Sequence, residues 1–466
     1  MSNTKQNRSI IAIITMMFLY AMISFVTNLA APIGVIWKGE FAGSNFIGML
    51  GNFANFLAYL FMGIPAGKLL IRIGYKKTAL TGIALGLIGV IVQFVSGTLS
   101  EGGATLAFTI YLLGAFVSGF CVCILNTVVN PMLNLIGGGG NRGNQLNLIG
   151  GTLNSLSGSL TPMLVGAIVG NIVTAETIKN GIDSVGTPLT TFSQVNPILY
   201  MAMGVFVLTF IILFFVPIKD PEYGKANINT VFEHSALDFR HCKLGVIAIF
   251  FYVGIEVGIP GTLTNYLSDQ SAKGGDIAGK AFVIATAVAT TYWLLMLIGR
   301  FIAGFIANKI SSKTMLTCTA AIAIVFLIIG MVFGKSTMID MPVYADNAFK
   351  TVNVPIAACF FVLCGLCTSI MWASIFNLAT EGLGKYNAQA SGIFMVMVVG
   401  GGILPLVQNY IADHVSYLFS YIIPLLGLVY LLYYAIIGNK NVNKEIPVKK
   451  QQYSKGNSLG LPLLII

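Results

Sequence analysis

Charged residues are scarce in this sequence. Only 9% of the 466 residues are Asp, Glu, Lys or Arg, whereas 56% are hydrophobic. A soluble globular domain carries about 25% charged residues. The composition therefore excludes an ordinary soluble globule and indicates that much of the chain faces lipid.

Residues suited to catalysis or metal binding are also few. The three histidines lie in predicted loops or near predicted helix ends, and the seven cysteines fall mostly in apolar runs. Cys364 and Cys367 are one helical turn apart but lack a second ligand pair, so we expect neither a metal site nor a disulfide framework. With no nucleophile–base pair and no P-loop lysine motif, we expect no enzyme activity and no cofactor.

Long apolar runs dominate what is present. A membrane-spanning helix needs about 20 mostly apolar residues. Twelve segments meet this requirement, and we predict an all-α membrane protein whose spans cover residues 10–36, 46–69, 78–98, 105–135, 146–172, 197–217, 244–267, 280–307, 314–334, 353–379, 387–412 and 417–437.

The positive charges predict the orientation of these spans. If both termini are cytoplasmic, 20 of the 26 Lys and Arg residues fall on the inner side and 6 on the outer side. Cytoplasmic loops of membrane proteins carry such an excess. The formal net charge of +10 is thus explained by a multi-pass protein of the cytoplasmic (inner) membrane, and we expect the lipid bilayer, not nucleic acid, as its surroundings.

The chain divides into two similar halves. The polar stretch 218–243 follows the sixth predicted span and separates a bundle at 1–217 from a second bundle at 244–437, with a cytoplasmic tail at 438–466. "GKLLIRIGYKKTAL" after the second span matches "GFIANKISSKTML" after the eighth, at an offset of 237 residues. Two six-helix halves related by a parallel repeat are typical of a major facilitator transporter.

Polar side chains and helix breakers lie deep in the predicted spans. Glu256 is the one acid that we place near the middle of the membrane, four residues before Pro260, and a carboxylate there is costly unless it has a function. Amides both donate and accept hydrogen bonds, as sugar hydroxyls require, and aromatic rings can stack on a sugar. The candidate ligands for an uncharged sugar are Asn28, Asn126, Asn154, Glu256, Trp372 and Gln408.

Several stretches resemble the fucose/glucose/galactose–proton symporters of the major facilitator superfamily. They include "NTVVNPMLNLIG" (126–137), "NQLNLIGGTLNSLSGSLTP" (144–162), "FYVGIEVGIPGTLTNYL" (251–267) and "SIMWASIFNLATEGLGKYNAQASG" (369–392). The resemblance covers roughly residues 10–437. It implies a sugar importer that works by alternating access, and we expect a monomer.

The resemblance also implies roles for particular residues. Asn154 matches the family's sugar-binding asparagine, while Gly151 replaces a ligand glutamine and Trp372 stands where fucose transporters have tyrosine. The loop motif of the superfamily is present after the second span, with Ile71 in place of its aspartate. This motif and the matching region of the second half contain the residues that we expect to control the conformational change: Gly67, Arg72, Gly74, Lys76, Arg300 and Lys309.

The sequence differs from that family in the residues that couple sugar transport to a proton. The two positions that the fucose symporters protonate hold Asn28 and Asn126, which cannot titrate. Either a proton acts at Glu256, or a sodium ion binds there, or the protein is an uncoupled facilitator; Glu256 is then a coupling group or a protonated sugar ligand. An efflux pump for hydrophobic compounds and a non-transporting sensor are the alternatives outside sugar transport.

Overall fold

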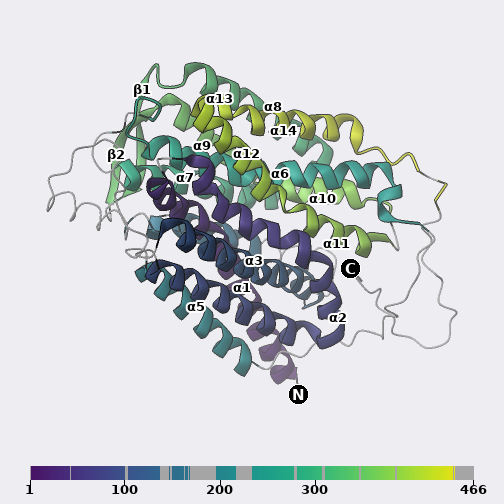
Figure 1. Cartoon of the computed structure of the whole chain (residues 1–466). Coiled ribbons are helices and arrows are strands. Elements are labelled where there is room, and N and C mark those ends of the chain that lie inside the picture. Colours follow the sequence, from purple (N-terminus) through teal and green to yellow (C-terminus); the bar gives the residue numbers. More distant parts are fainter. Residues whose placement is uncertain are drawn as a thin grey trace.

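The chain forms a bundle of long helices that lie side by side (Figure 1). The computed structural model describes residues 2–41, 44–99, 103–136, 146, 149–161, 163–165, 167, 196–216, 234–275, 277, 281–306, 310–345, 348–383, 386–443 and 445–446. The interdomain stretch predicted at 218–243 is described from residue 234 onward, and the predicted tail after residue 446 lies outside the described residues.

The first half comprises α1 (Ser2–Glu40), α2 (Asn45–Thr98), α3 (Ala104–Ile136), a helix over residues 149–161, and α5 (Asn196–Phe215). The second half begins with the short turn η3 (Ala236–Asp238). Its helices are α6 (Arg240–Ser268), α7 (Ala281–Ile306), α8 (Ser312–Phe333), α9 (Ile356–Thr368), α10 (Met371–Thr380), α11 (Asn387–Met397), α12 (Gly400–His414), α13 (Tyr417–Ser420), α14 (Ile422–Tyr433) and the π-helical turn η5 (Tyr434–Gly438).

Within the described residues, eleven stretches are long and apolar enough to cross a membrane. They follow the predicted spans in order, except the one predicted at 146–172, which lies partly outside the described residues. The predicted break between spans 46–69 and 78–98 is present as a kink. The range of α2 covers both spans, and its two helical parts meet in a kink at Gly74, whose non-helical φ of 82° suits a residue without a Cβ.

Two later spans each contain a short irregular turn. The span at 353–379 begins inside a strand and is broken between α9 and α10. The span at 387–412 is broken between α11 and α12, beside Gly400, Gly401 and Gly402. Hydropathy does not reveal such breaks because the residues at them remain apolar or small, and interruptions in membrane helices are typical of transporters.

An antiparallel hairpin projects from one end of the bundle, and the sequence analysis missed it. Strand β1 (Met338–Ala345) pairs with β2 (Ala348–Pro355), so that Asp340 lies opposite Asn353. We call this end, at the left of Figure 1, the hairpin end, and the opposite end, where residues 234–243 lie, the linker end.

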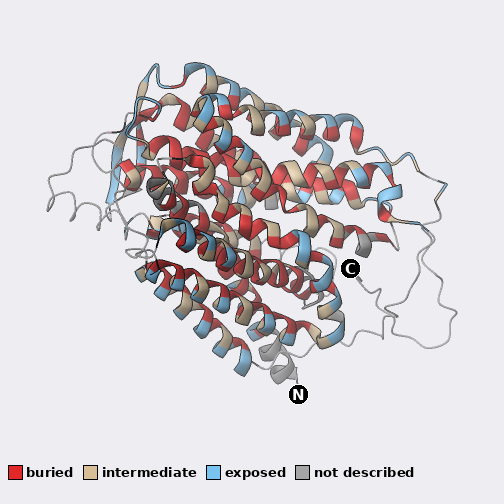
Figure 2. Cartoon of the chain, viewed as in Figure 1, coloured by how far each residue is buried: buried red, intermediate tan, exposed pale blue. Residues whose placement is uncertain are grey.

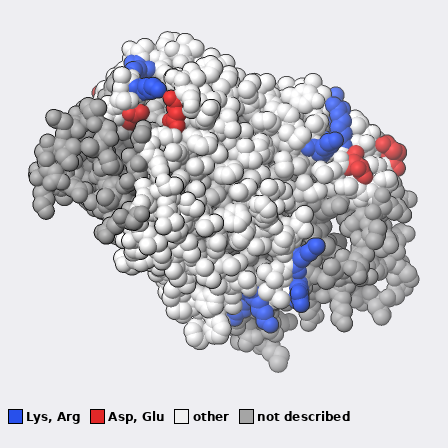
Figure 3. Space-filling model, viewed as in Figure 1, with Lys and Arg blue, Asp and Glu red and all other residues white. Residues whose placement is uncertain are grey.

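The outer faces of the helices are apolar. Phe215 and Val332 are 76% and 72% exposed, and many other large apolar side chains are exposed along the helices (Figure 2). On the face seen in Figure 3, the described charged residues gather at the two ends and leave a wide band without charge between them. A soluble monomer rarely exposes so large an apolar patch, whereas a lipid-facing surface requires it.

The halves meet closely along α2 and the pair α11–α12. A Cβ on Gly63 would lie 3.0 Å from the Val396 side chain, and one on Gly402 would lie 2.9 Å from that of Phe56. Small residues let membrane helices approach at short distance. This seam positions polar side chains of the first half directly against the second half.

Candidate functional site

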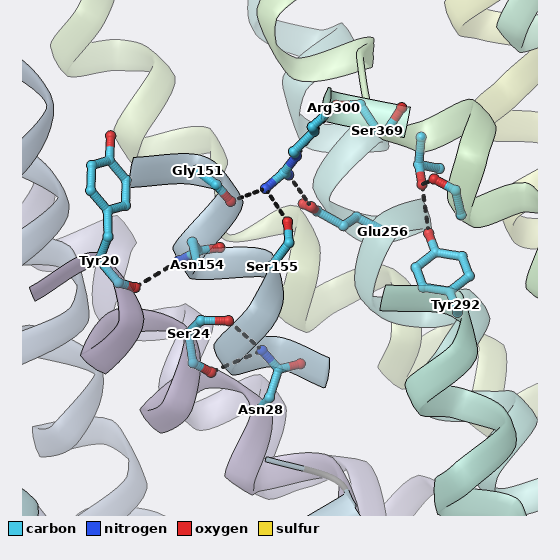
Figure 4. Close-up of polar contacts among 12 residues, drawn as sticks. Tyr20, Ser24, Asn28, Gly151, Asn154, Ser155, Glu256, Tyr292, Arg300 and Ser369 are labelled. Carbon is cyan, nitrogen blue, oxygen red and sulfur yellow. Dashed lines mark hydrogen bonds and ion pairs between the residues drawn. The ribbon is translucent and has the colours of Figure 1, made fainter. Parts of the chain in front are cut away.

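Arg300 is the centre of a polar cluster between the halves (Figure 4). It lies on α7. Its Nη1 donates to the Gly151 carbonyl oxygen at 3.0 Å and to Ser155 Oγ at 2.7 Å, both on the 149–161 helix. Its Nη2 lies 3.2 Å from Glu256 Oε1 and its Nε 3.4 Å from the Ser369 carbonyl oxygen. One guanidinium therefore joins α7 to the first half and to two other segments of the second half.

Glu256 supplies the negative charge of this cluster. It occupies the middle of α6, which runs from Arg240 to Ser268. Both Glu256 and Arg300 have 17% of their side-chain surface exposed. Water therefore reaches the pair only partly, and the two opposite charges stabilise each other against the loss of hydration.

Two of the predicted sugar ligands lie beside this cluster, on the first-half side. Asn154 Nδ2 donates to the Tyr20 carbonyl oxygen at 3.0 Å. Asn28 Nδ2 donates to the carbonyl oxygen and the Oγ of Ser24, at 2.9 and 3.1 Å. Both amides are thus held by α1 through their nitrogens, and among the described residues no hydrogen bond is made to their Oδ1 atoms. These oxygens can accept hydrogen bonds from a ligand hydroxyl.

Aromatic rings border the same region. Trp372 lies 6.0 Å, centroid to centroid, from Tyr252, which precedes Glu256 by one helical turn. The position of a Cβ on Gly158 would be 3.5 Å from Trp293 on α7 and 3.3 Å from Asn28 Nδ2. Trp293 and the α1 amide therefore both lie close to this glycine.

The other two predicted ligands are held elsewhere. Asn126 Nδ2 donates to Tyr59 Oη at 2.8 Å, a contact between α3 and α2 inside the first half. Gln408 is 1% exposed, and its Oε1 lies 2.6 Å from where a Cβ on Gly258 would be. The structure thus brings together Asn28, Asn154 and Glu256, with Trp372 close by, but places Gln408 in packed interior.

The predicted gating residues of the first half surround the kink in α2. Gly67 is buried and Arg72 is exposed. Lys76 Nζ donates to the carbonyl oxygens of Phe214 and Val216, both at 2.8 Å, where α5 ends. A lysine at a helix C-terminus satisfies free carbonyl groups, so Lys76 anchors α5 to α2. Lys309 lies outside the described residues.

Sequence reasoning missed the partners of Arg300. Ser155, Ser24 and Ser369 attracted no attention because single serines are common in membrane helices. Arg300 itself was predicted only as a gating residue. A signal was available: a cation inside a membrane span pairs with an acid or with backbone carbonyls, and Glu256 was already the one acid placed near that depth.

The cluster combines a carboxylate that can take up a proton or a cation, an arginine that contacts both halves, and neutral oxygen acceptors. No group of three or more His, Cys, Asp or Glu that could hold a metal occurs within the described residues. This chemistry suits recognition of a neutral polar solute together with a small cation.

Comparison with known proteins agrees with this architecture. The family model of the Major Facilitator Superfamily matches residues 13–405. The chain belongs to the Major Facilitator Superfamily. It is therefore a multi-pass membrane protein with the fold of that superfamily, as the twelve predicted spans and the sequence resemblance had indicated.

Similar proteins within the superfamily include sugar transporters. The chain is 28% identical to a glucose/galactose transporter of Brucella abortus biovar 1 (strain 9-941), over 92% of this chain and 94% of that protein. It is 23% identical to the L-fucose-proton symporter of Escherichia coli (strain K12), over 86% and 85% of the two chains. The crystal structure of the E. coli fucose:proton symporter superposes with a TM-score of 0.64 at 19% identity, covering 92% and 98% of the chains, and confirms the fold.

Proposed function

We propose that this chain is a secondary active sugar transporter that imports a hexose or deoxyhexose, such as glucose, galactose or fucose, by alternating access. The observation that carries the proposal is the cluster in which Arg300 joins Glu256 to Gly151 and Ser155 of the first half. The relatives named as glucose/galactose transporter and L-fucose-proton symporter support sugar as the substrate class.

Glu256 is the proposed site of coupling. When Glu256 is ionised, it shares Arg300 with the acceptors of the first half. A proton or a sodium ion at Glu256 weakens the attraction between Glu256 and Arg300. The Arg300 guanidinium is then held mainly by its hydrogen bonds to Gly151 and Ser155. Occupancy of the acid by a cation thereby alters a contact between the halves, as ion-coupled alternating access requires.

The sugar is proposed to bind against the Oδ1 atoms of Asn28 and Asn154, with the indole rings of Trp372 and Trp293 bordering the site. The amide oxygens accept from sugar hydroxyls, while Arg300 and Ser155 can donate. The charge pattern supports cytoplasmic termini in the inner membrane, and we propose a monomer as the transporting unit.

Uptake into liposomes containing the purified protein tests this function. Labelled glucose, galactose and fucose are supplied under an imposed inward proton gradient, an inward sodium gradient, or neither, with empty liposomes as the control. We expect accumulation above equilibrium under one of the two gradients and its collapse with the matching ionophore. Equilibration without accumulation would indicate an uncoupled facilitator, and uptake equal to that of empty liposomes for every sugar would refute the proposal.

A further inference from the structure

The carboxylate of Asp413 binds the first turn of α2 across the two halves. Asp413 Oδ1 accepts from the Asn45 backbone N–H at 2.7 Å and from Asn45 Nδ2 at 2.6 Å. Its Oδ2 accepts from Ser44 Oγ at 2.9 Å and from the Phe46 N–H at 2.8 Å. The partners are more than 360 residues apart in the chain, so these bonds are a tertiary contact between the halves.

The contact is chemically well matched. The first N–H groups of a helix lack partners within it and carry partial positive charge. Ser44 caps α2 by accepting from the Ile47 N–H. Asp413 accepts from the N–H groups of Asn45 and Phe46, the first two residues of the helix. Bonds from N–H or O–H groups to a carboxylate are stronger than those between neutral groups.

A second layer of bonds fixes this carboxylate and the asparagine. Tyr417 Oη donates to Asn45 Oδ1 at 3.0 Å and lies 2.9 Å from Asp269 Oδ2. Lys273 Nζ donates to the Asp413 carbonyl oxygen at 3.1 Å. Asn45 and Tyr417 are 3% and 1% exposed, so water competes little for these bonds. The start of α2 and the ends of α6 and α12 are thus connected by hydrogen bonds at the hairpin end.

The same seam continues toward the middle of the bundle. Asn52, two turns further along α2, donates through Nδ2 to the Gly401 carbonyl oxygen at 2.8 Å and is 1% exposed. Met49, between the two contacts, is also 1% exposed and lies 3.3 Å from where a Cβ on Gly261 would be. The buried residues Met49 and Asn52 thus continue the contact that Asp413 makes with the start of α2.

We propose that Asp413 is the latch of the gate at the hairpin end: it holds α2 against α12 in the state closed at that end, and it must release when the central site opens there. The inference rests on the proposed function in requiring alternating access. It assigns to Asp413 a conformational role, separate from binding of sugar or of the coupling cation. On the orientation proposed from the basic residues, this is the outer gate.

The first test measures the accessibility of position 49 in the full-length protein. Met49→Cys is introduced into the parent and into Asp413→Asn, and modification of that position by a water-soluble maleimide is followed by mass spectrometry in detergent, without sugar. We expect Asp413→Asn to raise the labelling rate about tenfold, because a charge-assisted bond contributes about one decade in the opening equilibrium. An unchanged rate would overturn the proposal.

The matched control is Asp340→Asn. Asp340 is an exposed acid on β1 at the same end, bonded to Asn353 Nδ2 at 2.9 Å. It lies outside the contact between α2 and α12, and we expect the labelling rate at position 49 to stay at the parent value. An increase equal to that of Asp413→Asn would show a general loosening of the hairpin end and would contradict a latch at Asp413.

A second pair of variants covers the case in which Asp413→Asn does not fold or only frays α2. Cysteines at Ser44 and Asp413, whose side-chain oxygens are 2.9 Å apart, are cross-linked by oxidation. We expect transport to stop and to return on reduction, whereas a cross-link between cysteines at Asp340 and Asn353 leaves it intact. Full transport through the first cross-linked protein would overturn the latch. A parent without sugar uptake would refute the proposed function alone, and the labelling rates would still decide on the latch.

Discussion

Arg300 and Glu256 form an ion pair across α7 and α6, with Nη2 and Oε1 3.2 Å apart and both side chains largely withdrawn from water. The arginine also reaches the first half through Gly151 and Ser155. A change in the charge of Glu256 is therefore felt directly at a contact between the halves. This link between a titratable acid and the interface is the basis of the coupling that we propose.

The pair predicts non-additive effects on stability. Arg300→Gln leaves the Glu256 carboxylate without its cation and should lower the free energy of unfolding by about 1–3 kcal/mol, less than the ~3–5 kcal/mol of a fully buried pair because water reaches it partly. The double variant with Glu256→Gln should lose less than the sum of the single losses. Thermal unfolding of purified protein in detergent measures this, with the exposed Glu445→Gln as a control. Strict additivity of the Tm changes would contradict an energetic coupling between Arg300 and Glu256.

Asn154 is predicted to contribute one hydrogen bond to the sugar. Asn154→Ala removes the Oδ1 acceptor and the tie to Tyr20. The sugar affinity should fall about two- to tenfold, since a neutral hydrogen bond is worth about 0.5–1.5 kcal/mol. Equilibrium binding and the KM of uptake report the change. Asn353→Ala, on the exposed face of the hairpin, should leave both unchanged, and equal behaviour of the two variants would remove Asn154 from the site.

Gly158 is predicted to keep the sugar site open to Asn28. A Cβ at this position would lie 2.9 Å from Ser24 Oγ and 3.3 Å from Asn28 Nδ2, so Gly158→Ala must displace the amide that α1 holds. We expect the KM for sugar to rise severalfold. Gly204→Ala, on α5, meets nothing within 4 Å and serves as the control. An unaltered KM in Gly158→Ala would show that the position of Asn28 does not matter to binding.

Much of the fold could be predicted because hydrophobic length is a local property. Each run of about 20 apolar residues predicts a span by itself, and the order of these runs in the sequence gives the order of the helices. The Gly74 kink lies in the gap between two such runs, whereas the irregular turns beside Ser369 and Gly400 interrupt no apolar run and could not be found that way. The hairpin at 338–355 was missed because a search for spans ignores an alternating pattern in a loop.

The site was predicted in its residue types more than in its contacts. Glu256, Asn28 and Asn154 stand out in the sequence because polar groups are rare at that depth, and the structure brings them near one another. That Arg300 would join them depends on four segments that are distant in the chain. The role of Asp413 is even harder to predict from the sequence, because an aspartate at the end of a span looks like an ordinary boundary residue until its partner on α2 is known.

Glu256→Gln provides the most direct test of coupling. The glutamine keeps the size of the side chain but cannot carry the charge, so the central site should still bind sugar while the link to the cation is lost. Exchange of labelled sugar between equal concentrations and accumulation driven by the productive gradient are measured in the same liposomes. We predict retained exchange and no accumulation; accumulation at the level of the parent protein would contradict the proposed role of Glu256.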